Sequence, residues 1–208
     1  MKTIILASES PRRKELLERI GLKVVAEPAA IDESAFISLE GRQMPLELSR
    51  RKAEFVAVRH RDAVVIGADT VVILGGRLMG KPRNKREAKQ MLRALSGQAH
   101  IVVTAFTVID TGTKKTLTAS VETTVYVKKL RSVDIDAYVR TGEPLGKAGA
   151  YAIQGLGAVL VEKIEGDYFN VVGLPLSKLA DSLKLLGIDV LHNQLSPPAK
   201  RAACSPAR

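Results

Sequence analysis

The segment from Ala63 to Leu74, AVVIGADTVVIL, is the feature that most constrains how this chain can fold. It is apolar on both faces, a pattern typical of a central strand that is covered on both sides. It is shorter than the roughly 20 residues that a membrane-spanning helix needs, and it carries Asp69 near its middle. The segment therefore predicts a buried strand of a sheet, and we expect no membrane span.

Apolar patterns on either side predict the elements that would cover this strand. Thr3 to Ala7 is typical of a short buried strand, and Ser10 with Pro11 then begins a helix that ends at Gly21. Further strands are expected near Lys23 to Ala26, His100 to Asp110, Lys115 to Lys128 and Ala158 to Ile164, and further helices from Pro45, from Asn84 to Gly97, from Ser132 (as the cap) to Gly142 and from Pro175 to Gly187. The glycine-rich stretch between Gly142 and Ala158 is expected to be an ordered loop. The predicted fold is an α/β fold with a mixed sheet flanked by helices, arranged as two lobes around a cleft.

Composition agrees with an ordinary folded protein of 208 residues, 46% of them hydrophobic and 26% charged. We expect a single domain over residues 1–191 and a disordered basic tail over 192–208, where periodicity is lost. The only cysteine, Cys204, cannot form an intramolecular disulfide, and the first residues do not resemble a secretory signal. Both features favour a cytoplasmic protein.

A net charge of +10 raises nucleic acid as a partner. The basic residues are nevertheless spread over several segments, without a basic helix or an aromatic-rich strand of the kinds that read bases. We therefore do not expect nucleic acid to be the main partner. A cleft that binds a polyphosphate would use the same charge.

The first candidate site is the loop from Ser8 to Lys14. A strand that ends in a tight turn and opens a helix directs free N–H groups and the positive end of the helix dipole at a ligand, which favours an anion. Arg12 and Arg13 lie in the first turn, where cations oppose the dipole unless an anion is bound. A solvated basic turn is the alternative, and the glycines of a Walker loop are missing.

The second candidate is Asp69 with Thr70 inside the apolar strand. A buried carboxylate needs hydrogen bonds, a cation or a metal, because an unpaired buried charge costs several kcal/mol. A functional role is the favoured interpretation. The alternative is an Asp at a strand end that bonds to a local turn, with Gly67 as a bulge.

The third set comprises Asp32, Glu33, Lys52 and Lys81. Carboxylates suit a hard cation such as Mg²⁺, and lysines would offset phosphate charge. Each alone is more often a surface charge, so only their convergence on one cleft would make a site. The three histidines lack ligand spacing and there is no cysteine cluster, so we expect no structural zinc.

Several segments together resemble one protein family, and the resemblance covers about Lys2 to Leu191. The segments are LASESPRRKELLERIG, IDES, GADTVV, GKP, MLRALSGQAH, EPLGKAGAYAIQG and GDYFNVVGLPL. In order and spacing they resemble the Maf family of nucleotide pyrophosphatases. One departure is Glu9, an acidic residue within the loop expected to bind phosphate.

The resemblance implies an elongated fold of the Maf and inosine-triphosphatase type, whose cleft holds a nucleoside triphosphate. It implies cleavage between the α and β phosphates with Mg²⁺ or Mn²⁺, and a homodimer. Asp69 matches the proton acceptor, and conserved cleft positions are matched by Ser8, Arg13, Glu33, Lys52 and Lys81. Arg12, Thr70 and Gln154 match the specificity positions of the branch that acts on dTTP and UTP.

From these matches we expect Glu33 and Asp69 to hold the metal, and Ser8, Arg13, Lys52 and Lys81 to bind the substrate. Two other classes of function stay open at this point. One is a nucleotide-binding regulator of cell division or septum formation that does not turn its ligand over. The other is an RNA-binding protein that uses the basic surface.

Overall fold

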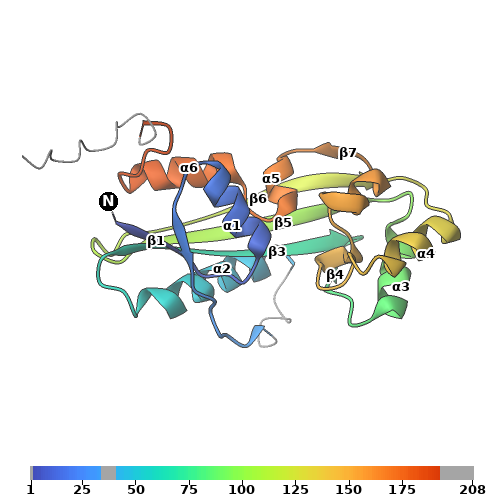
Figure 1. The fold of residues 1–208 in the computed structure, drawn as a ribbon, viewed down its shortest axis with the longest axis horizontal. Helices are drawn as coiled ribbons and strands as arrows, with labels where there is room; N and C mark the ends of the chain where they lie inside the picture. Colours follow the sequence, from blue (N-terminus) through green and yellow to red (C-terminus); the bar gives the residue numbers. More distant parts are fainter. Residues whose placement is uncertain (1, 34–40, 193–208) are drawn as a thin grey trace, which may run out of the picture.

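The computed structural model describes residues 2–33 and 41–192, which form one mixed sheet with helices on both faces (Figure 1). The strands are β1 Thr3–Leu6, β2 Val24–Ala26, β3 Ala63–Leu74, β4 Arg77–Met79, β5 Ala99–Asp110, β6 Thr116–Val127 and β7 Val161–Glu165. The helices are α1 Pro11–Arg19, α2 Gln43–Ala57, α3 Lys85–Leu95, α4 Ser132–Arg140, α5 Tyr168–Val172 and α6 Leu176–Leu185, with short 3₁₀ turns η2 Ala148–Ala150 and η3 Gly155–Leu160. No described helix is long and apolar enough to cross a bilayer.

Three long strands give the molecule its elongated shape. The sheet order is β2-β1-β3-β5-β6-β7, with β4 also paired to β3. The β1 strand runs parallel to β2 and to β3, and the remaining pairs are antiparallel. The expected mixed sheet with a central strand Ala63–Leu74 is therefore confirmed.

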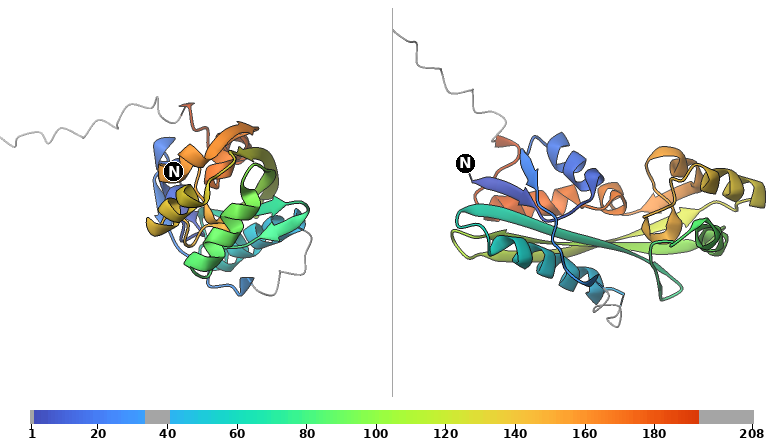
Figure 2. Two further views of the ribbon diagram at one scale, coloured as in Figure 1. Left: turned by 90° about the vertical axis from the view of Figure 1, so that its right-hand side faces the viewer. Right: turned by 60° about the horizontal axis from the view of Figure 1, so that its bottom comes forward.

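Two apolar clusters on one face of the sheet define the two lobes. One cluster packs α1 and α6 against one end of β3 and β5, and the other packs α3, α4 and the η2 turn against the opposite end. Helix α2 lies across the other face, over two smaller clusters (Figure 2). The strand pattern explains this division, since alternate residues of β3 contribute to opposite faces.

The edge of β3 is left without a strand partner at its middle. The β1 strand pairs with β3 only as far as Leu6 opposite Ile66, and β4 pairs with β3 only from Val72 onward. Among the described strands, none continues this edge beside residues 67–71, although β5 pairs with them on the other side. Asp69 and Thr70 therefore lie at an opening in the sheet, between the two lobes.

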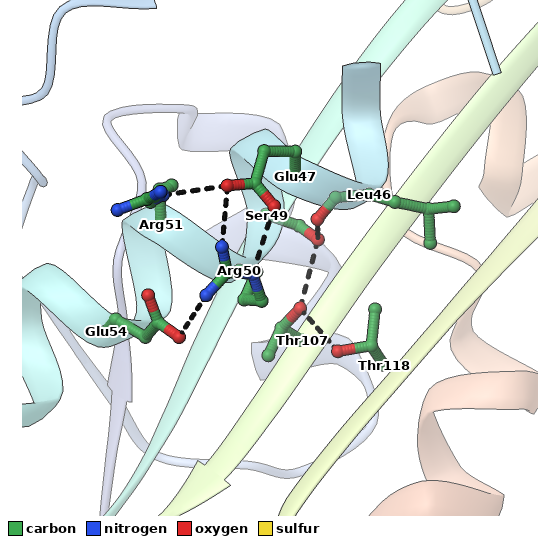
Figure 3. A network of polar contacts seen from close by, with 8 residues as sticks. All are labelled: Leu46, Glu47, Ser49, Arg50, Arg51, Glu54, Thr107 and Thr118. Atoms are coloured by element: carbon green, nitrogen blue, oxygen red, sulfur yellow. Dashed lines mark hydrogen bonds and ion pairs between the residues drawn. The ribbon is translucent and has the colours of Figure 1, made fainter. Parts of the chain in front are cut away.

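Helix α2 approaches β3 most closely at Gly67. A Cβ atom placed there would lie 2.2 Å from the Ser49 carbonyl oxygen and 2.7 Å from the Ala53 nitrogen. Next to this crossing, the Thr107 hydroxyl lies 3.1 Å from Ser49 Oγ and 2.9 Å from Thr118 Oγ1 (Figure 3). Ser49 Oγ donates to the Leu46 carbonyl, so Thr107 donates to Ser49 and fixes the helix on the sheet.

The close approach places Lys52 next to Asp69. Lys52 follows Ser49 by three residues on α2 and so lies on the same helix face. Asp69 follows Gly67 by two residues on β3 and so points to the same side of the sheet. Gly67 pairs in regular register with Thr107, so the alternative that Gly67 forms a bulge is wrong.

The other expected elements are present, with four differences. Helix α2 begins at Gln43, two residues before Pro45. Arg131 is the N-cap of α4, and its side chain makes no capping bond, so the expected Ser132 cap is wrong. The last strand begins at Val161 because the residues before it form η3. Helix α5 and strand β4 lie in segments where we predicted no regular structure.

Gly67→Ala should destabilise the fold, because the added methyl group meets backbone atoms of α2 that cannot move independently. We expect a loss of about 1–3 kcal/mol in the free energy of unfolding, measured by urea denaturation. Gly80→Ala is the matched control, since a Cβ at Gly80 meets no atom within 4 Å. Equal midpoints for the two variants would contradict the proposed packing constraint.

Candidate functional site

A cleft of about 660 Å³ lies at the opening in the sheet. Its walls are the loop before α1, the middle of β3, part of α2, the segment 145–154 and the end of α5. Every residue for which we predicted a role in catalysis, substrate binding, specificity or metal binding lines it: Ser8, Arg12, Arg13, Glu33, Lys52, Asp69, Thr70, Lys81 and Gln154. Asp32, considered beside Glu33, is not among the lining residues.

Lys52 links the two predicted metal ligands. Its ammonium nitrogen lies 2.7 Å from Asp69 Oδ1 and 2.7 Å from Glu33 Oε1. Lys52 and Asp69 are buried, at 8% and 9% exposure, whereas the Glu33 side chain is 46% exposed. The three groups therefore form a charge cluster that reaches from the sheet to the mouth of the cleft.

The pKa of Glu33 shows which charges act at this end of the cleft. Burial is the largest single effect and acts to raise it, but the hydrogen bond from Lys52 and the charges of Lys52, Lys81 and Arg13 together lower the pKa below its usual value. The carboxylate is thus held in its charged form. A charged carboxylate is the form that a divalent cation would need.

Arg13 forms hydrogen bonds with the unpaired middle of β3, on the face of the sheet opposite Asp69. Its Nε donates to the Gly173 carbonyl (2.8 Å), and its Nη1 donates to Ser8 Oγ (3.0 Å) and to the Ala68 carbonyl (2.9 Å). Its Nη2 donates to Thr70 Oγ1 (2.9 Å). A guanidinium carries five N–H groups, so these bonds leave one, on Nη2, for a substrate oxygen. Burial lowers the pKa of Arg13, yet the group stays charged.

A directed chain of hydroxyl groups fixes Thr70. Thr104 Oγ1 donates to the Asn170 carbonyl (2.8 Å), so the 2.9 Å contact between the two threonines has Thr70 as its donor. The hydroxyl proton of Thr70 is therefore committed to Thr104, and one of its lone pairs accepts from Arg13. The hydroxyl can offer a ligand only its remaining lone pair, and any influence of Thr70 on specificity acts through that or through Arg13.

Helix α5 supplies the Asn170 carbonyl at which this series of hydrogen bonds ends. Asp167 caps the helix by accepting from Phe169 N and Asn170 N, and the buried Asn170 side chain bonds Thr104 N (3.1 Å) and the Val102 carbonyl (3.0 Å). These contacts hold the helix end that carries the Gly173 carbonyl. The sequence signal that could have revealed this helix is Asp167, a residue type preferred at helix N-caps.

Tyr138 and Glu143 hold the cleft segment that carries Gln154 by hydrogen bonds to its backbone. Tyr138 Oη accepts from Ala152 N (3.2 Å) and donates to Glu143 Oε1 (2.9 Å). The same carboxylate accepts from Leu156 N (3.0 Å) and Gly157 N (2.9 Å). The backbone is therefore anchored on both sides of Gln154. The predicted ordered loop is confirmed in this segment, although our sequence reasoning did not identify its two anchors.

The chain matches the family of Maf-like proteins over residues 3–186. It belongs to the Maf family. A Maf-family relative from Pelotomaculum thermopropionicum, described as a dTTP/UTP pyrophosphatase, is 50% identical over 191 residues, covering 92% of this chain and 100% of the relative. One from Methanosarcina barkeri with the same description is 47% identical over 197 residues, covering 94% of this chain and 100% of the relative.

Among solved structures, the Ham1 protein of Staphylococcus aureus is similar with a TM-score of 0.46 and 13% identity, covering 77% of this chain and 80% of that chain. The match to the Maf-like family over residues 3–186 agrees with the resemblance that the sequence segments indicated. The predicted tail, 192–208, lies outside the described residues except for His192. No group of three or more metal-binding side chains occurs in the described ranges, which include all three histidines.

The stability of this Maf-family protein should fall between pH 6.5 and pH 4 because of His100. His100 is 2% exposed, and its Nε2 lies 2.8 Å from Tyr151 Oη behind the cleft. Burial lowers its pKa from 6.5 to about 4, so the unfolded chain binds the proton first. His100 therefore contributes a loss on the order of 3 kcal/mol as pH falls through this window.

Urea unfolding at several pH values tests this contribution. His100→Gln should show a smaller loss of stability than the wild type between pH 6.5 and pH 4. His192→Gln, which removes an exposed histidine that lies 2.9 Å from Asp189, should not reduce the loss. A His100→Gln profile parallel to that of the wild type would show that another group carries the effect.

Proposed function

We propose that the protein is a metal-dependent pyrophosphatase that hydrolyses dTTP and UTP to the nucleoside monophosphate and pyrophosphate. The curated relatives described as dTTP/UTP pyrophosphatases support this, since they are about half identical to this chain over nearly its whole length. The observation that carries it is the cluster of Asp69, Lys52 and Glu33, which converges with Arg13 in one cleft. Modified pyrimidine triphosphates are a further expected substrate class, consistent with a role in cleaning the nucleotide pool.

In the proposed reaction, Asp69 orients a water molecule toward the α-phosphorus and accepts its proton. The water oxygen forms a bond to the α-phosphorus while the bond from that phosphorus to the bridging oxygen breaks, so pyrophosphate leaves with the bond electrons. Lys52 holds Asp69 Oδ1, and none of the hydrogen bonds among residues 2–33 and 41–192 engages Oδ2. Oδ2 is thus the oxygen proposed to face the water.

Lys81, Lys52 and the remaining N–H group of Arg13 are proposed to act on the phosphates. Positive groups aimed at a leaving pyrophosphate stabilise the charge that develops on it, which is the main means of accelerating phosphoryl transfer. Ser8 Oγ accepts from Ser10 N (3.2 Å) and from Arg13, so its own proton is the donor left for a phosphate oxygen. These roles follow from donors that the protein leaves available.

The donor set fits a divalent cation such as Mg²⁺ or Mn²⁺. Mg²⁺ usually takes one or two carboxylates together with substrate phosphate oxygens, and Glu33 and Asp69 are two carboxylates that already meet at one cation, Lys52. When bound, the metal would polarise the phosphoryl oxygens and offset their charge. Glu33 and Asp69 are the residues proposed to hold it.

The cellular location and assembly are also proposals. A cytoplasmic site of action fits a chain whose only cysteine, Cys204, cannot form an internal disulfide. A homodimer is the assembly that the family resemblance implies, and sedimentation of the purified chain would test it.

Asp69→Asn should abolish most pyrophosphate release from dTTP and UTP with Mg²⁺, because the amide cannot accept the proton. We expect a fall in kcat of about 10²–10⁴ with a much smaller change in substrate affinity. Asp136→Asn is the matched control, since Asp136 pairs with Lys89 (2.7 Å) and does not line the cleft. Near-normal turnover by Asp69→Asn would make the assigned role wrong, and no release by the wild type would favour the non-catalytic regulator.

Arg12→Ala should change the ranking of substrates in a pyrophosphate-release screen over canonical and modified triphosphates. Arg12 lines the cleft close enough for its charge to lower the pKa of Lys147, on the segment that also carries Gln154. Loss of a contact to the nucleoside should affect some substrates more than others, by about ten-fold in kcat/KM. A uniform decrease for all triphosphates would instead place Arg12 on the phosphates.

A further inference from the structure

Lys147 is a cation in the cleft to which neither the sequence nor the family resemblance assigned a role. It lies on the segment between Glu143 and Gln154, is half-buried, and lines the cleft. Its Nζ donates to the Glu143 main-chain carbonyl. Among the described residues no carboxylate forms an ion pair with it, so its charge is not neutralised by a direct partner.

The Glu143 carboxylate forms no direct ion pair with Lys147 in the described part of the chain, although its negative charge acts to raise the pKa of the lysine. Both of its oxygens are occupied by Tyr138 Oη, Leu156 N and Gly157 N, which hold the loop. Gly155 also fits closely there, since a Cβ at that position would lie 2.8 Å from Glu143 Oε2. The main-chain carbonyl of Glu143 therefore binds Lys147, while its carboxylate accepts hydrogen bonds from the backbone of the loop.

The cations of the cleft differ in the groups on which their charges act. Lys52, Lys81 and Arg13 act on Glu33, at the end that contains both carboxylates proposed to bind metal. Arg12 acts on Lys147 as well as on Arg13, and burial together with the charge of Arg12 lowers the pKa of the lysine even though Glu143 acts to raise it. Arg12 and Lys147 line one cleft, and their like charges repel each other. An electron-rich ligand would relieve that repulsion.

We propose that Lys147 is a substrate-binding residue that donates a hydrogen bond from Nζ to an acceptor oxygen of the bound nucleotide, next to Arg12. The assignment rests on the proposed function for the identity of the ligand. An ammonium has three N–H groups and the Glu143 carbonyl takes one of them, so the donor capacity for this contact is present. The bond to the Glu143 carbonyl holds the nitrogen in the structure without a ligand.

The acceptor oxygen belongs either to a phosphate or to a carbonyl of the pyrimidine ring. Both are electron-rich oxygens that a lysine can bind. Inorganic tripolyphosphate separates them, because it has the phosphate oxygens and no base. The measurements are therefore KM and kcat for dTTP with Mg²⁺, and Kd for tripolyphosphate by calorimetry.

The variants are Lys147→Met, Lys147→Gln and Lys147→Arg, with Lys128→Met as the matched control. Lys128 also donates its Nζ to a main-chain carbonyl, that of Val159 (3.1 Å), but it is exposed and does not line the cleft. Its substitution removes one charge and one bond of the same kind. Melting temperatures identify any variant whose loop is disturbed.

Lys147→Met and Lys147→Gln should raise KM for dTTP about ten-fold to hundred-fold with kcat changed much less, as expected for a lost charged hydrogen bond. Lys147→Arg should recover most of the affinity, and Lys128→Met should match the wild type. Weaker tripolyphosphate binding as well would place the oxygen on a phosphate, and unchanged binding would place it on the base. Wild-type KM in Lys147→Met and Lys147→Gln would overturn the inference, whereas absent turnover by the wild type would overturn the proposed function itself.

Discussion

The unpaired middle of β3 is the constraint on which the candidate site depends. A strand edge inside a protein needs partners for its backbone groups, because an unpaired buried carbonyl costs free energy. Arg13 supplies one by donating to the Ala68 carbonyl, and it ties the same point to α5 and to the loop before α1. A backbone strand there would have closed the sheet, whereas a side chain leaves room for a cleft.

The alternation of side chains along β3 divides the chemistry between two faces. Asp69 points to the α2 face, where Lys52 meets it, and Thr70 points to the opposite face, where Arg13 meets it. A buried ion pair such as Lys52 with Asp69 contributes little net stability, since desolvation offsets most of the attraction. The role of the pair is therefore to position the Asp69 carboxylate at the opening in the sheet. The close packing of α2 at Gly67 makes that placement possible.

The sequence was sufficient for the parts of the fold that depend on local pattern. The apolar run around Asp69 and the helix expected from Asn84 predicted elements that the structure contains. It was insufficient where the determinant is a long-range contact. The five-residue helix α5 is held by the bonds of Asn170 to β5 as well as by its Asp167 cap, and nothing near Glu143 in the chain indicates that its carboxylate accepts from Leu156 and Gly157. In the same way, Arg12 and Arg13 look equivalent by their spacing in the sequence. What distinguishes them is that Arg13 donates to the distant carbonyls of Ala68 and Gly173.

The charge of the cleft also bears on why a metal belongs in the proposed reaction. Five cationic side chains line it, Arg12, Arg13, Lys52, Lys81 and Lys147, together with three carboxylates, Glu9, Glu33 and Asp69. A nucleoside triphosphate carries about four negative charges, more than this excess of cations can balance, whereas its complex with a divalent cation carries about two. Glu9, the acidic residue in the loop expected to bind phosphate, is one of the three carboxylates in this count, so its presence agrees with the charge of the cleft. This balance of charges supports the proposal of a metal-bound triphosphate as substrate, since the three carboxylates would repel a long polyanion that binds without a metal.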